Sequence, residues 1–180
     1  MKIYYEAVGK DVFHALPVTF HVKEGVDSSE WNQFRQYYEK SEADYLEYKS
    51  RAAAAKFDQS PLKNQEFPQS MRKNIWIIKP GENTNCGQGI QVAKDFDEIK
   101  SLVTDATINK RRTCIIQKYI HNPLLINKRK FDVRLFTLMT SINGVRRAYF
   151  YEEGYLRTSC REFSLNNLSN RMVHLTNDAV

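Results

Sequence analysis

The sequence has few cysteines and no pattern that would hold a structural metal or a disulfide framework. Its three cysteines, Cys86, Cys114 and Cys160, form no closely spaced pair. No apolar run approaches the roughly 20 residues that cross a membrane. The N-terminus lacks the basic start and apolar centre of a signal peptide. We therefore expect a cytoplasmic, reducing environment and no membrane partner.

Acidic residues are outnumbered by basic ones, which gives a formal charge of +6 and a pI near 9.2 over 180 residues. A basic surface can attract nucleic acid, anionic lipid or an acidic protein, but it can equally be a solvated face, and charge alone favours the latter. No RNA-recognition or helix-turn-helix signature is present, so we expect no nucleic-acid partner. The length suits one domain, or one and a part.

The first third of the chain reads as a short strand or two, a long helix and a linker. Residues 1–26 mix short apolar runs with glycine and proline. Residues 27–30 form a capping signature, and aromatic residues then recur at helical spacing to about Phe57, as expected of a helix packed on a core. Residues 58–73 are polar and contain two prolines. We therefore expect a boundary between an N-terminal segment, 1–73, and a second part, 74–180.

The second part alternates β-rich runs with one short helix. Strands are expected at 74–79, 90–93, 113–120 and 131–141, and a capping box at 95–98 opens a helix to about Val103. Residues 145–151 and 155–158 look like a hairpin around 152–154. The predicted fold class is α+β, with mainly antiparallel strands and flanking helices. No Pro or Gly closes the final segment, so we expect the chain to stop inside its domain.

The stretch IIKPGENTNCGQGI, residues 77–90, resembles a phosphate-holding loop, but it fails both common patterns. Gln88 stands where a Walker A loop has lysine, and Val92 stands where a dinucleotide fingerprint has its third glycine. Glycines still let backbone N–H groups approach an anion, and Lys79 supplies a positive charge. An ordinary hairpin loop with an exposed lysine explains the stretch equally well.

A second cluster of charge lies in KFDVRL, residues 130–135. Strand alternation places Lys130, Asp132 and Arg134 on one face of the strand and apolar residues on the other. Three charges in a row within an apolar strand suggest a wet cleft. The alternative is an exposed sheet face whose charges neutralise one another across strands.

Other candidates are weaker when taken singly. The strand end at Gln117 could offer backbone groups and an amide to a base edge, although most such segments are ordinary strand ends. Arg157 could bind a carboxylate or be a surface arginine. His174 could be a general base, but without a second metal ligand a hydrogen-bonded structural histidine is the commoner case. Thr176 and Asn177 could donate to phosphate or cap a helix.

Taken together and in order, these motifs resemble the tubulin–tyrosine-ligase-like family of ATP-grasp ligases. The similarity covers roughly residues 74–180, and residues 16–20 also resemble the family's upstream segment. The matching stretches are IWIIKP (75–80), GQGI (87–90), QKYI (117–120), PLLI (123–126), KFDVR (130–134), EGYLR (153–157) and HLTN (174–177).

The resemblance implies an ATP-grasp fold, here incomplete at the C-terminus, with ATP held between two β-rich subdomains. It implies a ligase that uses ATP to form an acyl phosphate, which an amine then displaces to give an amide. The implied partners are acidic tubulin or microtubule tails and a free amino acid. Glutamate is favoured, with tyrosine or glycine as alternatives. A monomer in the cytoplasm at the cytoskeleton, including cilium or basal body, is expected.

The resemblance also assigns roles to residues. Lys79 matches a lysine that contacts ATP phosphates, below a loop tip of Gly87, Gln88 and Gly89. The adenine hinge corresponds to Gln117, Lys118, Tyr119 and Ile120. Lys130, Asp132, Thr176 and Asn177 match nucleotide-binding positions, and Arg134, Arg157 and His174 match positions near the reacting groups.

Two departures from the family pattern affect this assignment. Many relatives have a basic or polar residue where Cys86 stands. The family's magnesium ligands lie beyond its His-Leu-Thr-Asn segment, so they are expected beyond Val180. Without them phosphate charge would be poorly neutralised, and we expect these 180 residues alone to have little or no ligase activity. A non-catalytic nucleotide- or microtubule-binding module is therefore the alternative function.

Overall fold

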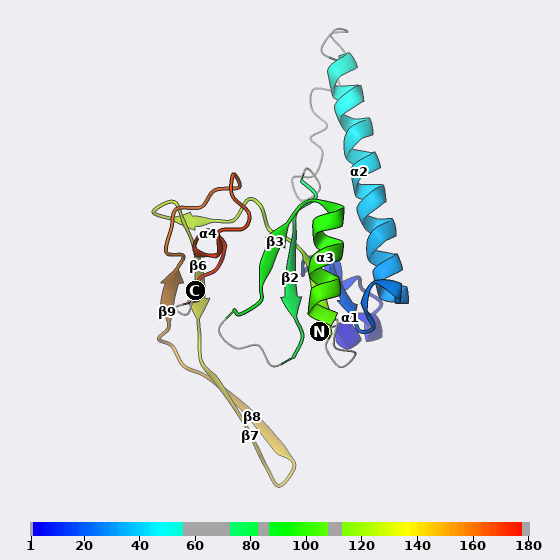
Figure 1. Cartoon of the computed structure of the whole chain (residues 1–180). Coiled ribbons are helices and arrows are strands. Elements are labelled where there is room, and N and C mark those ends of the chain that lie inside the picture. The colour runs from blue at the N-terminus through cyan, green and yellow to red at the C-terminus, as the bar shows by residue number, and fades with distance from the viewer. Residues whose placement is uncertain (1, 56–72, 83–86, 108–112, 178–180) are drawn as a thin grey trace. The chain divides into compact units, whose positions relative to one another are not determined.

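The chain folds into two compact units, unit 1 from Met1 to Asn122 and unit 2 from Pro123 to Val180 (Figure 1). The computed structural model describes residues 2–55, 73–82, 87–107 and 113–177. Within these ranges every helix is too short or too polar to span a lipid bilayer. Cys86 and residues 58–72 of the linker expected at 58–73 lie outside the described residues.

Unit 1 is built on a four-stranded antiparallel sheet. The strand order is β1-β4-β2-β3, so the two central strands come from the middle of the chain. Its elements are α1 (Lys2–Ala7), η1 (Val12–His14), β1 (Thr19–Val22), η2 (Gly25–Asp27), α2 (Ser29–Ala55), β2 (Trp76–Pro80), β3 (Gln91–Ala93), α3 (Phe96–Thr107) and β4 (Cys114–Lys118).

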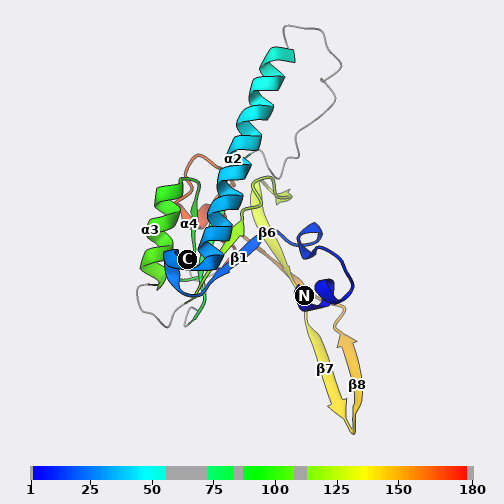
Figure 2. The same ribbon diagram turned by 90° about the vertical axis from the view of Figure 1, so that its right-hand side faces the viewer.

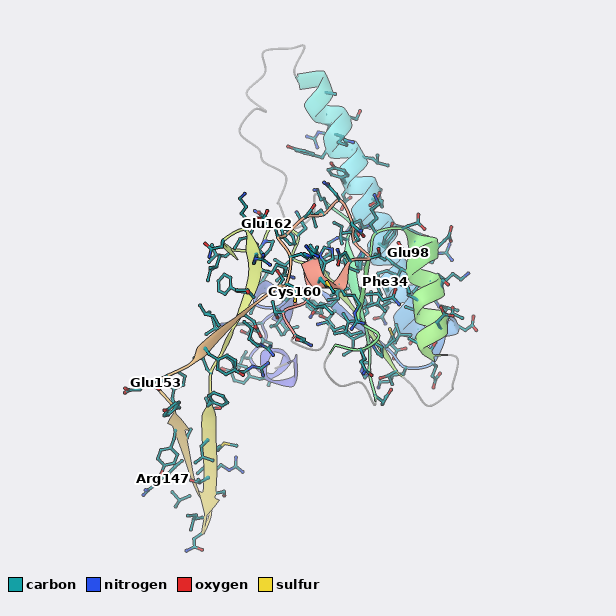
Figure 3. The ribbon with its side chains drawn as sticks, turned by 60° about the vertical axis from the view of Figure 1, so that its left-hand side comes forward. Phe34, Glu98, Arg147, Glu153, Cys160 and Glu162 are labelled. Carbon is teal, nitrogen blue, oxygen red and sulfur yellow. The ribbon has the colours of Figure 1, made fainter. Side chains whose placement is uncertain are left out.

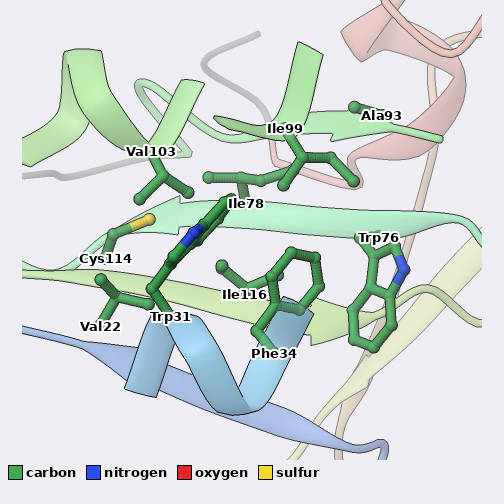
Figure 4. Close-up of a cluster of buried hydrophobic side chains, with 10 residues drawn as sticks. All are labelled: Val22, Trp31, Phe34, Trp76, Ile78, Ala93, Ile99, Val103, Cys114 and Ile116. Atoms are coloured by element: carbon green, nitrogen blue, oxygen red, sulfur yellow. The ribbon is translucent and has the colours of Figure 1, made fainter. Parts of the chain in front are cut away.

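One face of this sheet carries the hydrophobic core, which Figure 4 shows between the strands and the two helices. Trp31 and Phe34 come from α2, and Ile99 and Val103 come from α3. They pack on sheet residues such as Ile116, and all are nearly or fully buried. The first part of the predicted aromatic stripe of α2, up to Tyr38, therefore packs on the core as expected, whereas Tyr45 is not part of this cluster. The other sheet face carries the residues that alternate with the core positions.

The units divide at a different place from the boundary predicted at 73/74. Strand β1 pairs with β4, and α2 packs on the same core as β2 and β4. The segment before residue 73 therefore folds together with the strands that follow it, and the division comes after β4, at 122/123. Residues 1–26 also contain a helix, α1, where the sequence suggested only strand and loop.

Both helix starts follow local capping chemistry. Asp95 Oδ1 accepts from the backbone N–H groups of Asp97 and Glu98, at 3.0 and 3.1 Å, so the predicted cap of α3 is confirmed. At α2 the cap is Ser28, whose hydroxyl oxygen accepts from the Trp31 N–H at 3.2 Å. The predicted cap there was placed one residue early, because Asp27 belongs to the preceding turn of η2.

Unit 2 contains two small antiparallel sheets and one short helix. The three-stranded sheet has the order β5-β6-β9, and β7 and β8 form a separate two-stranded ribbon. The antiparallel sheets and flanking helices of the two units confirm the predicted α+β class. The elements of unit 2 are β5 (Leu125–Ile126), β6 (Arg129–Arg134), β7 (Thr137–Ile142), β8 (Val145–Phe150), β9 (Tyr155–Thr158) and α4 (Arg171–His174).

The hairpin predicted between 145–151 and 155–158 is wrong. Strand β8 pairs with β7 through a turn at Asn143 and Gly144, and β9 pairs with β6. Both turn residues have positive φ, 49° and 80°, as a tight hairpin turn of matching twist requires. The single strand predicted at 131–141 is likewise two strands, because the chain leaves the β6 ladder after Arg134.

The β7–β8 ribbon exposes side chains on both faces. It extends away from β6 and β9 (Figure 1), and Figure 2 shows it from another side. Met139 is 74% exposed, and Tyr149 and Phe150 are more than half exposed. Arg147 projects from the same ribbon (Figure 3), and no acidic residue lies between 137 and 151. The surface of the ribbon is therefore apolar and basic, and few of its side chains are buried in a core.

Candidate functional site

The predicted site residues fall into two sets, one in each unit. In unit 1, Lys79 and Gln117 share the sheet face opposite the helices, because they alternate with the core residues Ile78 and Ile116. Lys79 Nζ donates to Gln117 Oε1 at 2.8 Å. The loop lysine and the strand-end amide, which the sequence placed 38 residues apart, are thus in direct contact.

Lys79 is half-buried, and this burial lowers the pKa of its ammonium group from the usual lysine value. Its hydrogen bond to Gln117 acts the other way, because an amide oxygen can only accept and therefore favours the protonated amine. The result is a positive charge held on a partly desolvated sheet face. Such a group attracts phosphate more strongly than a fully solvated lysine does.

The loop that follows Lys79 is fixed at its base. Gly81 N–H donates to Thr113 O at 2.7 Å, and Glu82 accepts from the Thr113 N–H and hydroxyl at 2.6 and 2.9 Å. On the far side, Gly89 has φ +73°, and a Cβ there would lie 2.8 Å from Pro80 Cγ. Only glycine fits that position without displacing the proline ring. Gly87 also has positive φ, and Gln88 is exposed.

The predicted adenine hinge is the segment that leaves β4. Two of its backbone donors are already used, since Lys118 N–H donates to Val18 O at 2.8 Å and Tyr119 N–H donates to Ile75 O at 2.9 Å. Ile120 follows with its side chain 58% exposed, and its N–H has no partner among the described residues. Within the hinge, Ile120 is therefore the residue whose N–H is available to a base edge.

Lys118 points to the other side of the sheet from Lys79. Its ammonium group lies 4.7 Å from the centre of the Trp76 ring and donates to Asn74 Oδ1 at 3.0 Å. The same oxygen accepts from Trp76 Nε1 at 2.7 Å. Burial lowers the pKa of Lys118 to about 8, with nearby Glu42 opposing the shift. This side chain lies on the core side of the sheet, away from the face that carries Lys79 and Gln117.

A cavity of about 580 Å³ borders the hinge within unit 1. It is walled by the N-terminal segment around η1, by Tyr37 of α2 and by the chain from Lys118 to Asn122. Its lining is mostly apolar and includes Phe13 and Leu16, which suits a flat organic group more than a bare ion.

In unit 2, Asp132 and Arg157 face each other across β6 and β9 and form a two-point ion pair. Arg157 Nε donates to Asp132 Oδ1 at 3.0 Å, and its Nη2 donates to Oδ2. These bonds, first among the causes, hold the pKa of Asp132 below its usual value, and burial partly opposes them. The arginine predicted to hold a substrate carboxylate is thus already engaged by a carboxylate of its own chain.

Further predicted residues gather around this pair. A hydrogen bond from Thr176 and the charge of Arg134, whose Nη2 lies 4.0 Å from Asp132 Oδ2, also lower the pKa of Asp132. Arg134 is about half exposed, unlike Arg157, whose side chain is 19% exposed. Asn177 follows Thr176 directly and is partly buried.

Lys130, two residues before Asp132 in β6, contacts His174 of α4. Lys130 Nζ donates to the backbone oxygen of His174 at 3.1 Å. The imidazole is nearly fully buried, its Nε2–H donates to Asn167 O at 2.9 Å, and the Phe163 ring packs edge-on against it. Burial is the first cause that lowers the pKa of His174. This setting matches the structural alternative for His174, a neutral histidine that holds the chain.

Three residues around the loop and the strand end were not expected from the sequence. Glu82 and Thr113 anchor the loop, and Thr19 accepts a hydrogen bond from Gln117 Nε2 at 2.9 Å. The partners are 31 and 98 residues apart. No local pattern signals such contacts, because they depend on which strands become neighbours.

The sequence profile of the tubulin-tyrosine ligase family matches residues 18–180, which include every predicted site residue. The chain belongs to the tubulin-tyrosine ligase family. The match begins within one residue of β1, so it includes the N-terminal strand and the long helix as well as the motifs from residue 74 onward.

Individual relatives within the family are named as glycylases. The chain is 36% identical to tubulin monoglycylase TTLL3 of Mus musculus over 84% of its own length and 17% of that protein. It is 41% identical to tubulin glycylase 3D of Tetrahymena thermophila, over 64% of this chain and 10% of that one. It is 34% identical to protein monoglycylase TTLL8 of Mus musculus, over 87% and 19%. The chain thus spans under a fifth of the length of these relatives.

A solved structure with a similar course is the C-terminal domain of K. lactis Pby1, described as an ATP-grasp enzyme. It is 17% identical, covers 90% of this chain and 37% of that chain, and has a TM-score of 0.40. At this score the two chains share too little geometry for residue positions to be compared.

The predicted amino acid needs correction after these comparisons. The sequence favoured glutamate, with a polyglutamylase or tyrosine ligase as the type of enzyme. The relatives above are named for glycine. The preference for glutamate is therefore not supported, and glycine replaces it below.

Proposed function

We propose that this chain is part of an ATP-dependent ligase that joins glycine to tubulin. The observation that carries the proposal is the family match over residues 18–180, together with relatives named as glycylases. The basic composition supports it further, because an acidic tubulin tail would be attracted to a protein of net charge +6.

The chain's own residues would bind and orient the reactants. ATP, when bound, supplies the phosphoryl group that activates a carboxylate. Lys79 and Lys130 offer ammonium groups to phosphate oxygens, and the N–H of Ile120 offers a donor to the base. Arg134, about half exposed beside Asp132, is the arginine best placed to meet an incoming carboxylate. Positioning and positive charge are the main requirements of phosphoryl transfer.

Metal-binding side chains are not clustered among the described residues. Among them, no group of three or more His, Cys, Asp or Glu side chains lies close enough to hold a metal ion. The one carboxylate among the predicted site residues, Asp132, is engaged by Arg157. We therefore assign no step to a metal held by these residues.

The first test is nucleotide binding by the 180-residue chain. Calorimetry with ATP should show that Lys79→Ala and Lys130→Ala each weaken binding by roughly 10- to 100-fold, the usual cost of losing a charged hydrogen bond. Lys94→Ala and Lys128→Ala are matched controls on exposed lysines and should bind as the unsubstituted chain does. Equal affinity in all five proteins would mean that the nucleotide site is wrongly placed.

The second test separates the amino acids. Full-length protein that carries this chain is incubated with tubulin, ATP and radiolabelled glycine or glutamate. Glycine should be incorporated well above glutamate, and Lys79→Ala should remove the incorporation. Glutamate incorporated at an equal or higher rate would contradict the glycine assignment. ATP binding without incorporation of either would favour a non-catalytic nucleotide-binding module.

A further inference from the structure

Lys79 stands at the end of a continuous line of hydrogen bonds that crosses three segments of unit 1. Thr19 Oγ1 donates to Pro17 O at 2.8 Å, Gln117 Nε2 donates to Thr19 Oγ1 at 2.9 Å, and Lys79 Nζ donates to Gln117 Oε1 at 2.8 Å. Thr19 and Gln117 are direct partners in the β1–β4 ladder, so they share a sheet face. The line therefore runs from β1 across β4 to the end of β2.

The direction of each hydrogen bond follows from the donors available. The Pro17 oxygen can only accept, so the single hydroxyl proton of Thr19 is directed to it and Thr19 Oγ1 is left to accept. Gln117 must then turn its NH₂ group toward Thr19 and its oxygen toward β2. A protonated lysine can only donate, and the oxygen that Gln117 presents is the group it needs. If the amide were reversed, the Gln117 NH₂ group would face the Lys79 ammonium group, and both can only donate.

We propose that Thr19 is a positioning residue for Lys79, acting through the amide of Gln117. Its hydroxyl fixes which end of that amide faces the lysine, and so where the ammonium group is held. The role of Lys79 toward phosphate rests on the proposed function, but the orientation itself does not. The Thr19 hydroxyl bonds to Pro17 and Gln117, so its effect on Lys79 passes through Gln117.

The orientation matters because Lys79 is partly buried. Burial disfavours its charged form, and the Gln117 oxygen counteracts that cost. If the amide were free to rotate, its NH₂ group would face the lysine part of the time and favour the neutral amine. Loss of the Thr19 hydroxyl should therefore lower the pKa of Lys79 further and loosen its position.

The first experiment measures this on Lys79 directly, without nucleotide. Thr19→Val removes the hydroxyl but keeps the branched shape that suits a strand, and Thr19→Ser keeps the hydroxyl. NMR titration of the Lys79 side chain should show its pKa lower by about half a unit to one unit in Thr19→Val. Thr19→Ser should restore it. Thr137→Val, an exposed strand threonine in unit 2, is the control for the substitution itself.

A double substitution tests whether the effect passes through Gln117. Gln117→Leu removes the middle of the line, so adding Thr19→Val to it should change the Lys79 pKa no further. Additive shifts would show that Thr19 acts by another route and would overturn the proposal. An unchanged Lys79 pKa in Thr19→Val alone would overturn it as well.

The same variants with ATP separate this inference from the proposed function. Thr19→Val should weaken ATP binding by about three- to tenfold, less than Lys79→Ala, and Thr19→Ser should restore it. If Lys79→Ala leaves ATP affinity unchanged, the proposed nucleotide role fails, while the pKa result still decides the role of Thr19. If Lys79→Ala weakens binding and Thr19→Val does not, Thr19 does not position the lysine for phosphate.

Discussion

At the scale of single residues, Lys118 stands out because its side chain is buried, which is unusual for a lysine. It is 8% exposed on the core face of β4, over the Trp76 ring and within reach of Asn74. The ring and the amide oxygen replace part of its lost hydration. They do not replace all of it, since burial still lowers the pKa of Lys118 to about 8.

This shift predicts how stability depends on pH. Between about pH 8 and the unfolded value of 10.5, the unfolded chain holds a proton that folded Lys118 has released, so the free energy of unfolding rises with pH. The contribution is at most about 3 kcal/mol. Lys118→Met removes the buried charge, so the variant should be more stable than the unsubstituted chain at pH 8. This difference in the free energy of unfolding should shrink as the pH rises from 8 to 10, because folded Lys118 then loses its charge. Urea unfolding at several pH values measures this.

Lys118→Arg is the matched control, because arginine stays protonated throughout this range. It should show no gain in stability between pH 8 and 10 from this position. A stability difference between Lys118→Met and the unsubstituted chain that stays constant with pH would mean that Lys118 keeps its proton in the folded state.

Single residues also show how far sequence reasoning could reach into the site. Alternation within KFDVR predicted correctly that Lys130, Asp132 and Arg134 share one face. It left open whether the charges meet a ligand or one another, and the register of β9 decides this for Asp132 by placing Arg157 opposite it. Local periodicity orients side chains, but the partner of a strand is set by distant residues.

At the scale of elements, the β7–β8 ribbon depends on its turn. Asn143 and Gly144 both adopt positive φ, and a Cβ added at Gly144 would meet no atom within 4 Å. A side chain at position 144 would therefore clash with no neighbouring atom, and its cost would come from the backbone conformation alone. The ribbon has no packed face to compensate for a poorer turn.

Gly144→Ala should accordingly lower the free energy of opening the ribbon by about 1–2 kcal/mol, which is the cost of a left-handed conformation for a residue with a Cβ. Hydrogen exchange should be faster for the amides of β7 and β8 and unchanged in β6 and β9. Asn143→Gly relieves positive φ at the neighbouring position and should not speed exchange. Faster exchange throughout unit 2 would mean that the ribbon supports the sheet beside it.

The turn also explains the one hairpin that was predicted in the wrong place. Asn-Gly between two β-rich runs is the strongest short hairpin signal, whereas the prediction placed the turn around 152–154. Gly154 has another purpose: a Cβ there would lie 2.7 Å from Arg134 O, where the chain returns to β6. Its glycine reflects close tertiary approach, which the sequence does not reveal.

At the scale of the whole molecule, the two units differ in how much apolar surface they bury. All buried hydrophobic side chains among the described residues belong to unit 1, except Val173. Unit 2 relies more on polar contacts such as the Asp132–Arg157 pair and the buried His174. Its backbone should therefore open more readily than that of unit 1.

Phe34→Ala tests this division. Phe34 is fully buried and touches Trp76, Trp31 and Phe96. Its truncation should lower the stability of unit 1 by about 3–5 kcal/mol. Native-state hydrogen exchange should show the loss in β2, β4 and α3, with little change in β6 and β9. Phe150→Ala on the exposed ribbon is the control, and an equal loss in both units would show that they unfold as one.

The architecture was predictable where local signals and burial coincide, as in α2, α3 and the strands around IIKP. The boundary at 73/74 was predicted from composition. In the structure β1, which precedes the polar stretch, pairs with β4, which follows it, so both belong to unit 1.

The ion pair between Asp132 and Arg157 constrains how this sequence can vary. The two side chains share two hydrogen bonds across a ladder, so replacing either alone leaves a partly buried charge without its counterpart. A homologue that lacks the aspartate is therefore expected to lack the arginine too. The two positions should covary, even though 24 residues and two further strands lie between them.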